Sequence, residues 1–462
     1  MKWIQRLLQA WLLYRQGRAV LPTNTGLLLA LILSIAVILI SLWIGLSIGL
    51  ALVAVWGIFT YALYRQGFAI KDLLRMSWER GKTSVVVIRI LLLIGWLTAM
   101  WQASGTTPMI LATSMELLHP QYFIISAFLL TSMVSLLIGT SFGTVATIGV
   151  VLITIAKAGG IPLGMAAGAI MAGAYVGDRN SPISSSAALV ASLTHTTVNS
   201  NVLRMLKDSI PALAVSAVIY LLLSTFYPLS YESSYLPDTI HFLFHLHWSL
   251  WIPVALIIAL LPTRLSIHWP IAMSAVAAAI LAMIHQHYSI NQIAQFSLFG
   301  FQLPHFNPLA EIIKGGGLLS MAMPILVIFM ACSIAGMLDN TGVWTDLRRL
   351  LTNLRGRSQL YGANVILAFI TGALGCSQAI SVIMTHSIMR TTYAKEGIKD
   401  EDVMLDFENS GILISPLLPW NIAAFVPIVM MDVSSTGYIP FAFFLYVAPL
   451  MYWYRLKRKE SL

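Results

Sequence analysis

A polar break, Gly177-Asp-Arg-Asn-Ser-Pro-Ile-Ser-Ser-Ser186, follows an apolar segment that is long enough to cross a membrane. The second half of the chain contains a similar break, Glu408-Asn-Ser-Gly411, followed by Ser415-Pro-Leu-Leu-Pro-Trp-Asn421. In hydrocarbon every backbone N–H and C=O group needs a partner, so irregular backbone persists only where protein or a wet cavity supplies one. We therefore predict helices that are broken at membrane depth, and such breaks mark binding sites.

The composition around these breaks is that of a membrane protein. Of 462 residues, 58% are hydrophobic and only 10% are charged, and the mean hydropathy is +0.82, whereas soluble domains carry about 25% charged residues. Long apolar runs favour helices over barrel strands, which alternate over about ten residues. Apolar runs that fit a span occur at 23–42, 44–63, 85–103, 121–138, 145–176 (broken or doubled), 208–227, 247–262, 268–284, 317–338, 359–374, 411–432 and 436–454. With short and re-entrant pieces, we predict an all-α polytopic protein with roughly 11 to 13 membrane segments.

The net charge of +9 is explained by position. Lys and Arg gather in the first 82 residues, at 348–357 and at Arg455–Lys459, and none occurs between Lys207 and Arg264. Basic loops stay in the cytoplasm. We therefore expect both termini inside, the segment 1–22 as an interfacial helix, and the polar stretch 230–248 outside.

The two breaks recur at similar spacing. Gly139-Thr-Ser-Phe-Gly-Thr144 precedes Ser181, with 38 positions from Gly143 to Ser181, and Gly372-Ala-Leu-Gly-Cys-Ser377 precedes Ser415, with 40 positions from Gly375 to Ser415. The first unit starts from the cytoplasmic side and the second from outside, which predicts inverted repeats. The alternative is that these small residues only let helices pack closely.

The predicted organisation has six parts. They are a cytoplasmic interfacial segment (1–22), a helical hairpin with a basic cytoplasmic loop (23–84), a first inverted repeat (85–227), connecting membrane helices and external loops (228–316), a second inverted repeat (317–454) and a basic cytoplasmic tail (455–462).

Asp178 and Glu408 are the candidate ion-binding acids, because an ionisable group inside a membrane is costly and marks a functional site by default. Sodium prefers oxygen ligands, and a buried carboxylate holds either a proton or a sodium ion, which is what antiport requires. The candidate ion- or substrate-binding residues are Thr140, Ser141, Thr144, Asp178, Asn180, Ser181, Ser184, Ser377, Glu408, Asn409, Ser410, Ser415, Trp420 and Asn421. Arg179 either neutralises Asp178 or binds an anionic substrate.

Four stretches carry a family resemblance. They are Trp101-Gln-Ala-Ser-Gly-Thr-Thr-Pro108, Gly139–Thr144, Gly173-Ala-Tyr-Val-Gly-Asp178 with Ser181-Pro-Ile-Ser184, and the second-half break from Glu408 to Asn421. At these residues the chain resembles the NhaC family of sodium/proton antiporters, within the larger ion transporter superfamily. The resemblance implies sodium efflux driven by inward proton movement across a bacterial plasma membrane.

One departure separates the chain from that family. After the Ser-Pro-x-Ser element the family continues Asp-Thr-Thr-Asn, whereas this chain has Ser185-Ser-Ala-Ala188. The loss of a carboxylate and an amide leaves more of the cation binding to Asp178 and Glu408. It also fits an alternative that the resemblance implies, the transport of an organic acid such as malate or lactate, or of an amino acid, with sodium or protons.

Other function classes have less support. The chain lacks the metal-protease, nucleophile-elbow and phosphate-loop motifs of enzymes, so we expect a transporter and no prosthetic group. The expected partners are Na⁺ and H⁺ as transported ions and the lipid bilayer, with no nucleic acid, and a homodimer is left open.

Overall fold

The computed structural model describes residues 23–44, 46–117, 119–230, 236–260, 268–303, 313–339 and 356–460. In these ranges the chain is helical apart from connections and one antiparallel pair of two-residue strands, β1 (Phe301–Gln302) and β2 (Lys314–Gly315). The prediction of an all-α polytopic membrane protein is confirmed. The predicted interfacial segment 1–22 lies outside the described residues.

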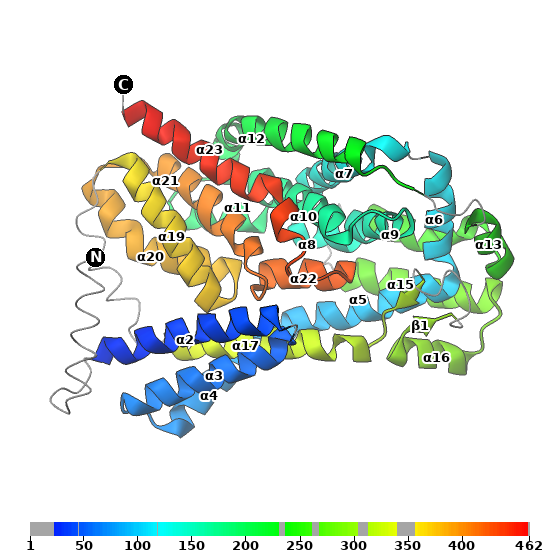
Figure 1. Ribbon diagram of the computed structural model, residues 1–462, viewed down its shortest axis with the longest axis horizontal. Coiled ribbons are helices and arrows are strands. Elements are labelled where there is room, and N and C mark those ends of the chain that lie inside the picture. Colours follow the sequence, from blue (N-terminus) through cyan, green and yellow to red (C-terminus); the bar gives the residue numbers. More distant parts are fainter. Residues whose placement is uncertain are drawn as a thin grey trace. The chain divides into compact units, whose positions relative to one another are not determined.

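The chain divides into two compact units, residues 1–84 with 326–350, and residues 85–325 with 351–462. The first contains α2 (Thr23–Trp43), α3 (Ile48–Arg65), α4 (Ile70–Gly81), η1 (Lys82–Ser84) and most of α17 (Ala322–Asp339). Helices α2 and α3 lie side by side (Figure 1). The segment that the sequence predicts as a basic cytoplasmic loop contains α4, an amphipathic helix whose Leu73 is buried while its charged residues are exposed.

The second unit contains the remaining helices. In chain order they are α5 (Val85–Ser104), α6 (Thr106–Leu117), η2 (Pro120–Tyr122), α7 (Phe123–Ile138), α8 (Ser141–Thr144), η3 (Val145–Gly149), α9 (Val150–Ala158), α10 (Leu163–Asn180), α11 (Ser185–Leu193), α12 (Val198–Phe226), α13 (Leu236–Leu243), η4 (Trp248–Trp251), α14 (Ile252–Leu260), α15 (His268–His285), α16 (Ile290–Phe299), η5 (Leu319–Met321), α19 (Arg357–Gly375), α20 (Gln378–Lys395), α21 (Asp400–Phe407), η6 (Glu408–Ile412), η7 (Ser415–Leu417), α22 (Ile422–Met431), η8 (Ile439–Phe441) and α23 (Phe443–Glu460).

In the described part, eight helices are long and apolar enough to span a membrane. A further pair, Asp400–Leu417 and Ile422–Met431, together fits a span that is bent by 49°. The segment 145–176, which the sequence predicts as broken or doubled, belongs to two helices, one ending at Ala158 and the next beginning at Leu163. The basic residues of the predicted tail lie on α23, which continues to Glu460.

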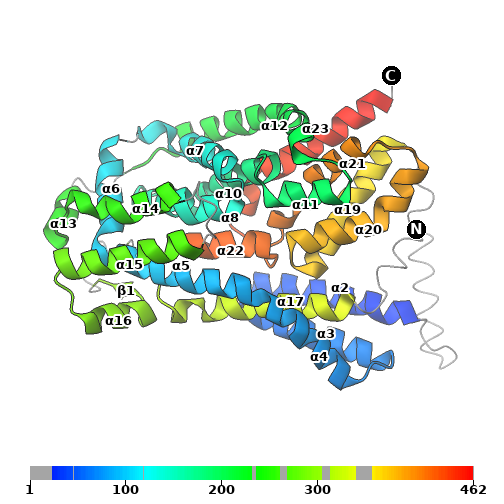
Figure 2. The same ribbon diagram turned by 180° about the vertical axis from the view of Figure 1, so that it is seen from behind.

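Helix α20 is absent from the sequence-predicted spans. Its 18 residues include His386, Arg390, Lys395 and several Ser and Thr residues, so no apolar run is visible. It packs beside α19 as a hairpin in both views (Figures 1 and 2). This hairpin lies toward one end of the second unit, and α6 and α9 lie toward the other end.

Helix α10 forms the core of the second unit, because every residue from Met165 to Asn180 is buried. Small residues let its neighbours approach closely, as is common in membranes. At Gly177 an added Cβ atom would lie 2.0 Å from the carbonyl group of Ser135 on α7. This close contact fixes the end of α10, where Asp178, Arg179 and Asn180 lie.

Candidate functional site

The chain is interrupted between α7 and α8 and between α19 and α20, and these two interruptions, the hairpin breaks, have the same local backbone conformation. Helix α7 ends before Gly139 (φ 75), and Thr140 is extended (φ −141, ψ 134) before α8 begins. Helix α19 ends before Cys376 (φ 52), and Ser377 is extended (φ −146, ψ 135) before α20 begins. At both breaks the chain therefore leaves one helix through a residue in the left-handed conformation and begins the next helix after an extended residue.

The later breaks also correspond. After α10 the chain is extended at Ser181, and the Ser184 hydroxyl accepts a hydrogen bond from the N–H of Ala187 at 3.1 Å to cap α11. After η6 and η7 the chain is extended at Leu418, and Asn421 caps α22 by accepting from the N–H of Ala423 at 3.0 Å. The two inverted repeats stay a prediction.

Asp178 lies where the two hairpin breaks meet. Its carboxylate accepts hydrogen bonds from the backbone N–H of Ser141, from Gln378 Nε2 at 3.1 Å and from Ser186 Oγ at 3.0 Å. Ser141 and Gln378 are the first residues of α8 and α20. Helix N-termini favour negative charge, so this position suits an ionised carboxylate although Asp178 is only 3% exposed.

Glu408 begins the π-helical turn η6 and is fully buried. Among the described residues, neither of its carboxylate oxygens has a hydrogen-bond partner. It interacts electrostatically with Asp178 and Arg179. Because an unpaired buried charge costs several kcal/mol, this carboxyl group requires a proton or a bound cation.

Asp406, two residues before Glu408, has the opposite surroundings. Arg357 donates to both of its oxygens, the second of these bonds measuring 2.7 Å from Nη2 to Oδ1. The hydroxyls of Tyr393 and Tyr452 donate to it at 2.6 and 2.9 Å. Its charge is fully compensated, which indicates a structural role.

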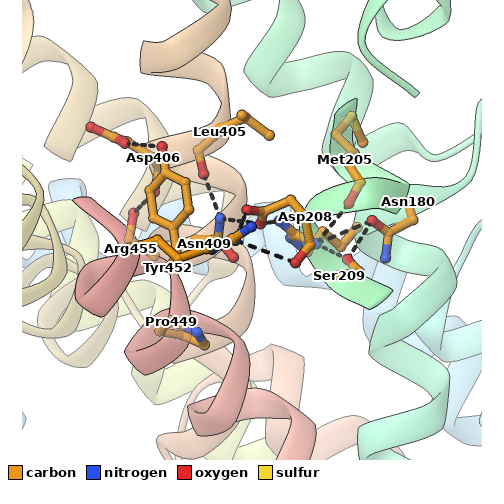
Figure 3. Close-up of polar contacts among 12 residues, drawn as sticks. Asn180, Met205, Asp208, Ser209, Leu405, Asp406, Asn409, Pro449, Tyr452 and Arg455 are labelled. Carbon is orange, nitrogen blue, oxygen red and sulfur yellow. Dashed lines mark hydrogen bonds and ion pairs between the residues drawn. The ribbon is translucent and has the colours of Figure 1, made fainter. Parts of the chain in front are cut away.

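A second network surrounds Asp208 on α12 (Figure 3). Arg179 Nη2 donates to Asp208 Oδ2 at 2.5 Å, and Asn409 Nδ2 donates to the same oxygen at 2.9 Å. Arg455 on α23 pairs with the other oxygen. The sequence left open whether Arg179 neutralises Asp178, and in the structure its ion pair is with Asp208.

The other predicted site residues mostly bond to backbone carbonyl groups. Ser181 donates to Leu136, Ser184 to Asp178, Thr144 to Thr140, Ser410 to Asp406, Ser415 to Gly411, Trp420 to Ala373 and Asn421 to Gly372. Thr140 caps α8, Asn180 accepts from Ser209 at 2.8 Å, and Ser377 precedes α20. These contacts hold the breaks in place and leave oxygen lone pairs for ligands.

Asn364 on α19 is a candidate that the sequence analysis missed. It is fully buried, and neither of its amide atoms has a partner among the described residues. Tyr361, one turn earlier, donates to the carbonyl of Asn409 at 3.0 Å, so this face of α19 packs against η6. The sequence signal that could have identified Asn364 is its polar amide inside the apolar run 359–374. Gln378, Ser186 and Asp208 were also missed.

A cavity of about 290 Å³ lies between α5, α9 and the end of α22. Its polar lining includes Lys157, Gln102, Thr154, Ser320 and Asp432. By the predicted topology these residues lie near the outer face, so the cavity is a candidate outer vestibule.

Membrane-spanning helices, broken helices and buried unpaired polar groups together define a membrane transporter. A model of the Na⁺/H⁺ antiporter family matches residues 18–223 and 173–454. The chain therefore belongs to the Na⁺/H⁺ antiporter family, and the resemblance to NhaC proteins is confirmed.

Three relatives cover most of the chain. The malate-2H⁺/Na⁺-lactate antiporter of Bacillus subtilis (strain 168) is 30% identical over 92% of this chain and 91% of its own length. The Na⁺/H⁺ antiporter NhaC of the same organism is 28% identical over 83% and 86%. The Na⁺/H⁺ antiporter NhaC of Alkalihalophilus pseudofirmus (strain ATCC BAA-2126 / JCM 17055 / OF4) is 26% identical over 92% of each chain.

Proposed function

We propose that this protein exports sodium in exchange for protons by alternating access across a bacterial plasma membrane, with both termini in the cytoplasm. The family and its NhaC relatives support Na⁺/H⁺ exchange. One observation supports placing this exchange at Glu408: its carboxyl group is fully buried, and its two oxygens have no hydrogen-bond partner among the described residues. A proton or a sodium ion satisfies this group, and each excludes the other.

Asp178 and Glu408 are the acids of the proposed site. Asp178 is held at the N-termini of α8 and α20, where the helix ends favour the negative charge that attracts cations. Glu408 is the acid that changes its partner during the cycle. Asn364 and Asn409 each have a buried side-chain oxygen with no partner among the described residues, and these oxygens complete the sodium ligands.

Transport by the purified protein in liposomes tests this proposal. Sodium added to liposomes with an imposed pH gradient should collapse the gradient with the wild type, and Glu408→Gln should abolish the response. Asp178→Asn should abolish it as well, because the site loses the fixed charge that attracts sodium. A wild-type protein that ignores sodium would refute the proposed exchange.

A second candidate is the coupled transport of an organic acid with sodium or protons. Two observations favour it. One relative is named a malate-2H⁺/Na⁺-lactate antiporter, and the lining of the 290 Å³ cavity includes Lys157 together with Asp432, so it offers a positive group to a carboxylate. In the same liposomes, a gradient that collapses only when malate or lactate is present would favour this candidate.

A further inference from the structure

Asp208 is a further buried carboxylate, next to the proposed sodium site and outside it. Its side chain is 7% exposed and receives hydrogen bonds from Arg179, Asn409 and Arg455. Two of these donors, Arg179 and Asn409, directly follow the two acids of the proposed site in the chain. Asp208 therefore accepts hydrogen bonds from the residue that follows Asp178 and from the residue that follows Glu408. Figure 3 shows Asp208 at the centre of this network.

Arg179 is a fully buried cation with more than one carboxylate within electrostatic range. One of its terminal nitrogens pairs with Asp208 at 2.5 Å, and the other donates to Asn180 at 3.1 Å and to Ser209. Its Nε atom has no hydrogen-bond partner in the described part of the chain, and the guanidinium interacts electrostatically with Glu408. A guanidinium forms strong two-pronged pairs with carboxylates, so Glu408, with both oxygens unsatisfied, is the competing partner.

We propose that Asp208 is a positioning residue that retains Arg179 and thereby keeps Glu408 available to sodium. A released guanidinium would pair with Glu408 and take the place of the transported cation, because both carry one positive charge and need the same oxygens. The inference rests on the proposed function, since it assumes that Glu408 binds sodium.

The arrangement of donors around Asp208 fits this role. Arg179 Nη2 and Asn409 Nδ2 bind the same oxygen of Asp208, so the guanidinium lies next to the residue that follows Glu408. Arg455 reaches the other oxygen from α23 with a side chain that is 41% exposed. Asp208 is thus paired with two arginines, and only the buried one faces the site.

The test is the sodium dependence of exchange in liposomes. Asp208→Asn should raise the KM for sodium by about tenfold or more, because a freed charge competes at close range in a poorly screened site, while kcat changes little. The double variant Asp208→Asn with Arg179→Gln should restore the KM, because the competitor is gone. Asp402→Asn, which removes a carboxylate from the exposed pair with Arg204, is the matched control and should leave the KM unchanged.

Each outcome decides the inference. An active wild type with an unchanged KM in Asp208→Asn overturns the inference alone, and so does a raised KM that the double variant fails to restore. If Asp208→Asn does not fold, the single variant Arg179→Gln decides, because Asp208 keeps its contacts with Arg455 and Asn409 in that variant. An unchanged or lower KM for sodium supports the inference, and a raised KM overturns it. A wild type without any sodium response overturns the proposed function and this inference together.

Discussion

Asp406 and Glu408 are two residues apart and equally buried, yet only one of them is paired. Arg357, Tyr393 and Tyr452 compensate Asp406 completely. Glu408 has no comparable partner among the described residues. The polar contacts of the two acids therefore distinguish the compensated carboxylate of Asp406 from that of Glu408, which we propose binds the transported ions.

Replacing each acid by its amide should separate the two roles. Asp406→Asn should lower the unfolding temperature, because it leaves Arg357 largely buried without its counter-charge, a loss of about 3 to 5 kcal/mol. Glu408→Gln should leave the unfolding temperature unchanged or higher, because an unpaired buried acid is removed, while sodium transport is lost. Thermal unfolding and exchange assays on the same preparations give both readouts, and a strongly destabilised Glu408→Gln would argue against the assignment.

Substitution of Asn364 should change the sodium dependence of exchange more than the stability of the fold. Asn364→Leu removes two buried polar atoms that have no partner among the described residues, so the folded state loses no hydrogen bond seen here. The variant should fold normally and need several times more sodium for half-maximal exchange. Asn201→Leu on α12 is the comparison, because Asn201 is also buried and its Oδ1 atom has no partner among the described residues. Equal sodium dependence in wild type and Asn364→Leu would remove Asn364 from the site.

At the scale of elements, the packing of α7 against α10 positions Asp178. Gly177 allows the backbones to meet, and its N–H donates to the Ser135 hydroxyl at 3.1 Å. Any side chain at Gly177 must displace the backbone of α7 and with it the last turn of α10. Precise positioning of Asp178 therefore depends on a glycine one residue before it.

Alanine substitutions should make this dependence measurable. Gly177→Ala should lower stability by about 1 to 3 kcal/mol or more, because overpacking at a backbone contact cannot be relieved by side-chain movement. Gly57→Ala on α3 is the matched control, since nothing lies within 4 Å of its added Cβ atom. Thermal unfolding in detergent compares the two. A Gly177→Ala protein as stable as the control would contradict the packing described here.

The sequence predicted the breaks because their Gly, Ser and Pro residues interrupt otherwise apolar runs. It did not predict α20, whose polar residues conceal a helix that packs in a hairpin with α19. It identified Asp178 and Glu408 but missed Gln378 and Asp208, because a contact partner 200 or 201 positions away leaves no local pattern. Tertiary contacts, not composition, decide which polar residues face the acids.

At the scale of the whole molecule, charge distribution predicts the orientation in the membrane. The stretch around α16 is poor in Lys and Arg, whereas the end of α20 and the connection after it carry Arg390, Lys395 and Lys399. By the rule that basic loops remain inside, α16 should lie outside and the end of α20 in the cytoplasm.

Cysteine labelling in intact cells checks this orientation. Asn291→Cys on α16 should react with a membrane-impermeant maleimide, and Glu396→Cys should react only after the cells are opened. Both positions are exposed, and the native Cys332 and Cys376 are buried, so the background should be low. The reverse labelling pattern would invert the topology and the direction of transport.

The exchange chemistry at Glu408 can be measured without a membrane. Adding sodium to the purified protein in weakly buffered detergent solution should release protons, because sodium displaces the proton from this carboxyl group. The half-maximal sodium concentration should rise as the pH falls, and Glu408→Gln should release none. Sodium binding without proton release, or equal release from Glu408→Gln, would contradict competition between the two cations at this residue.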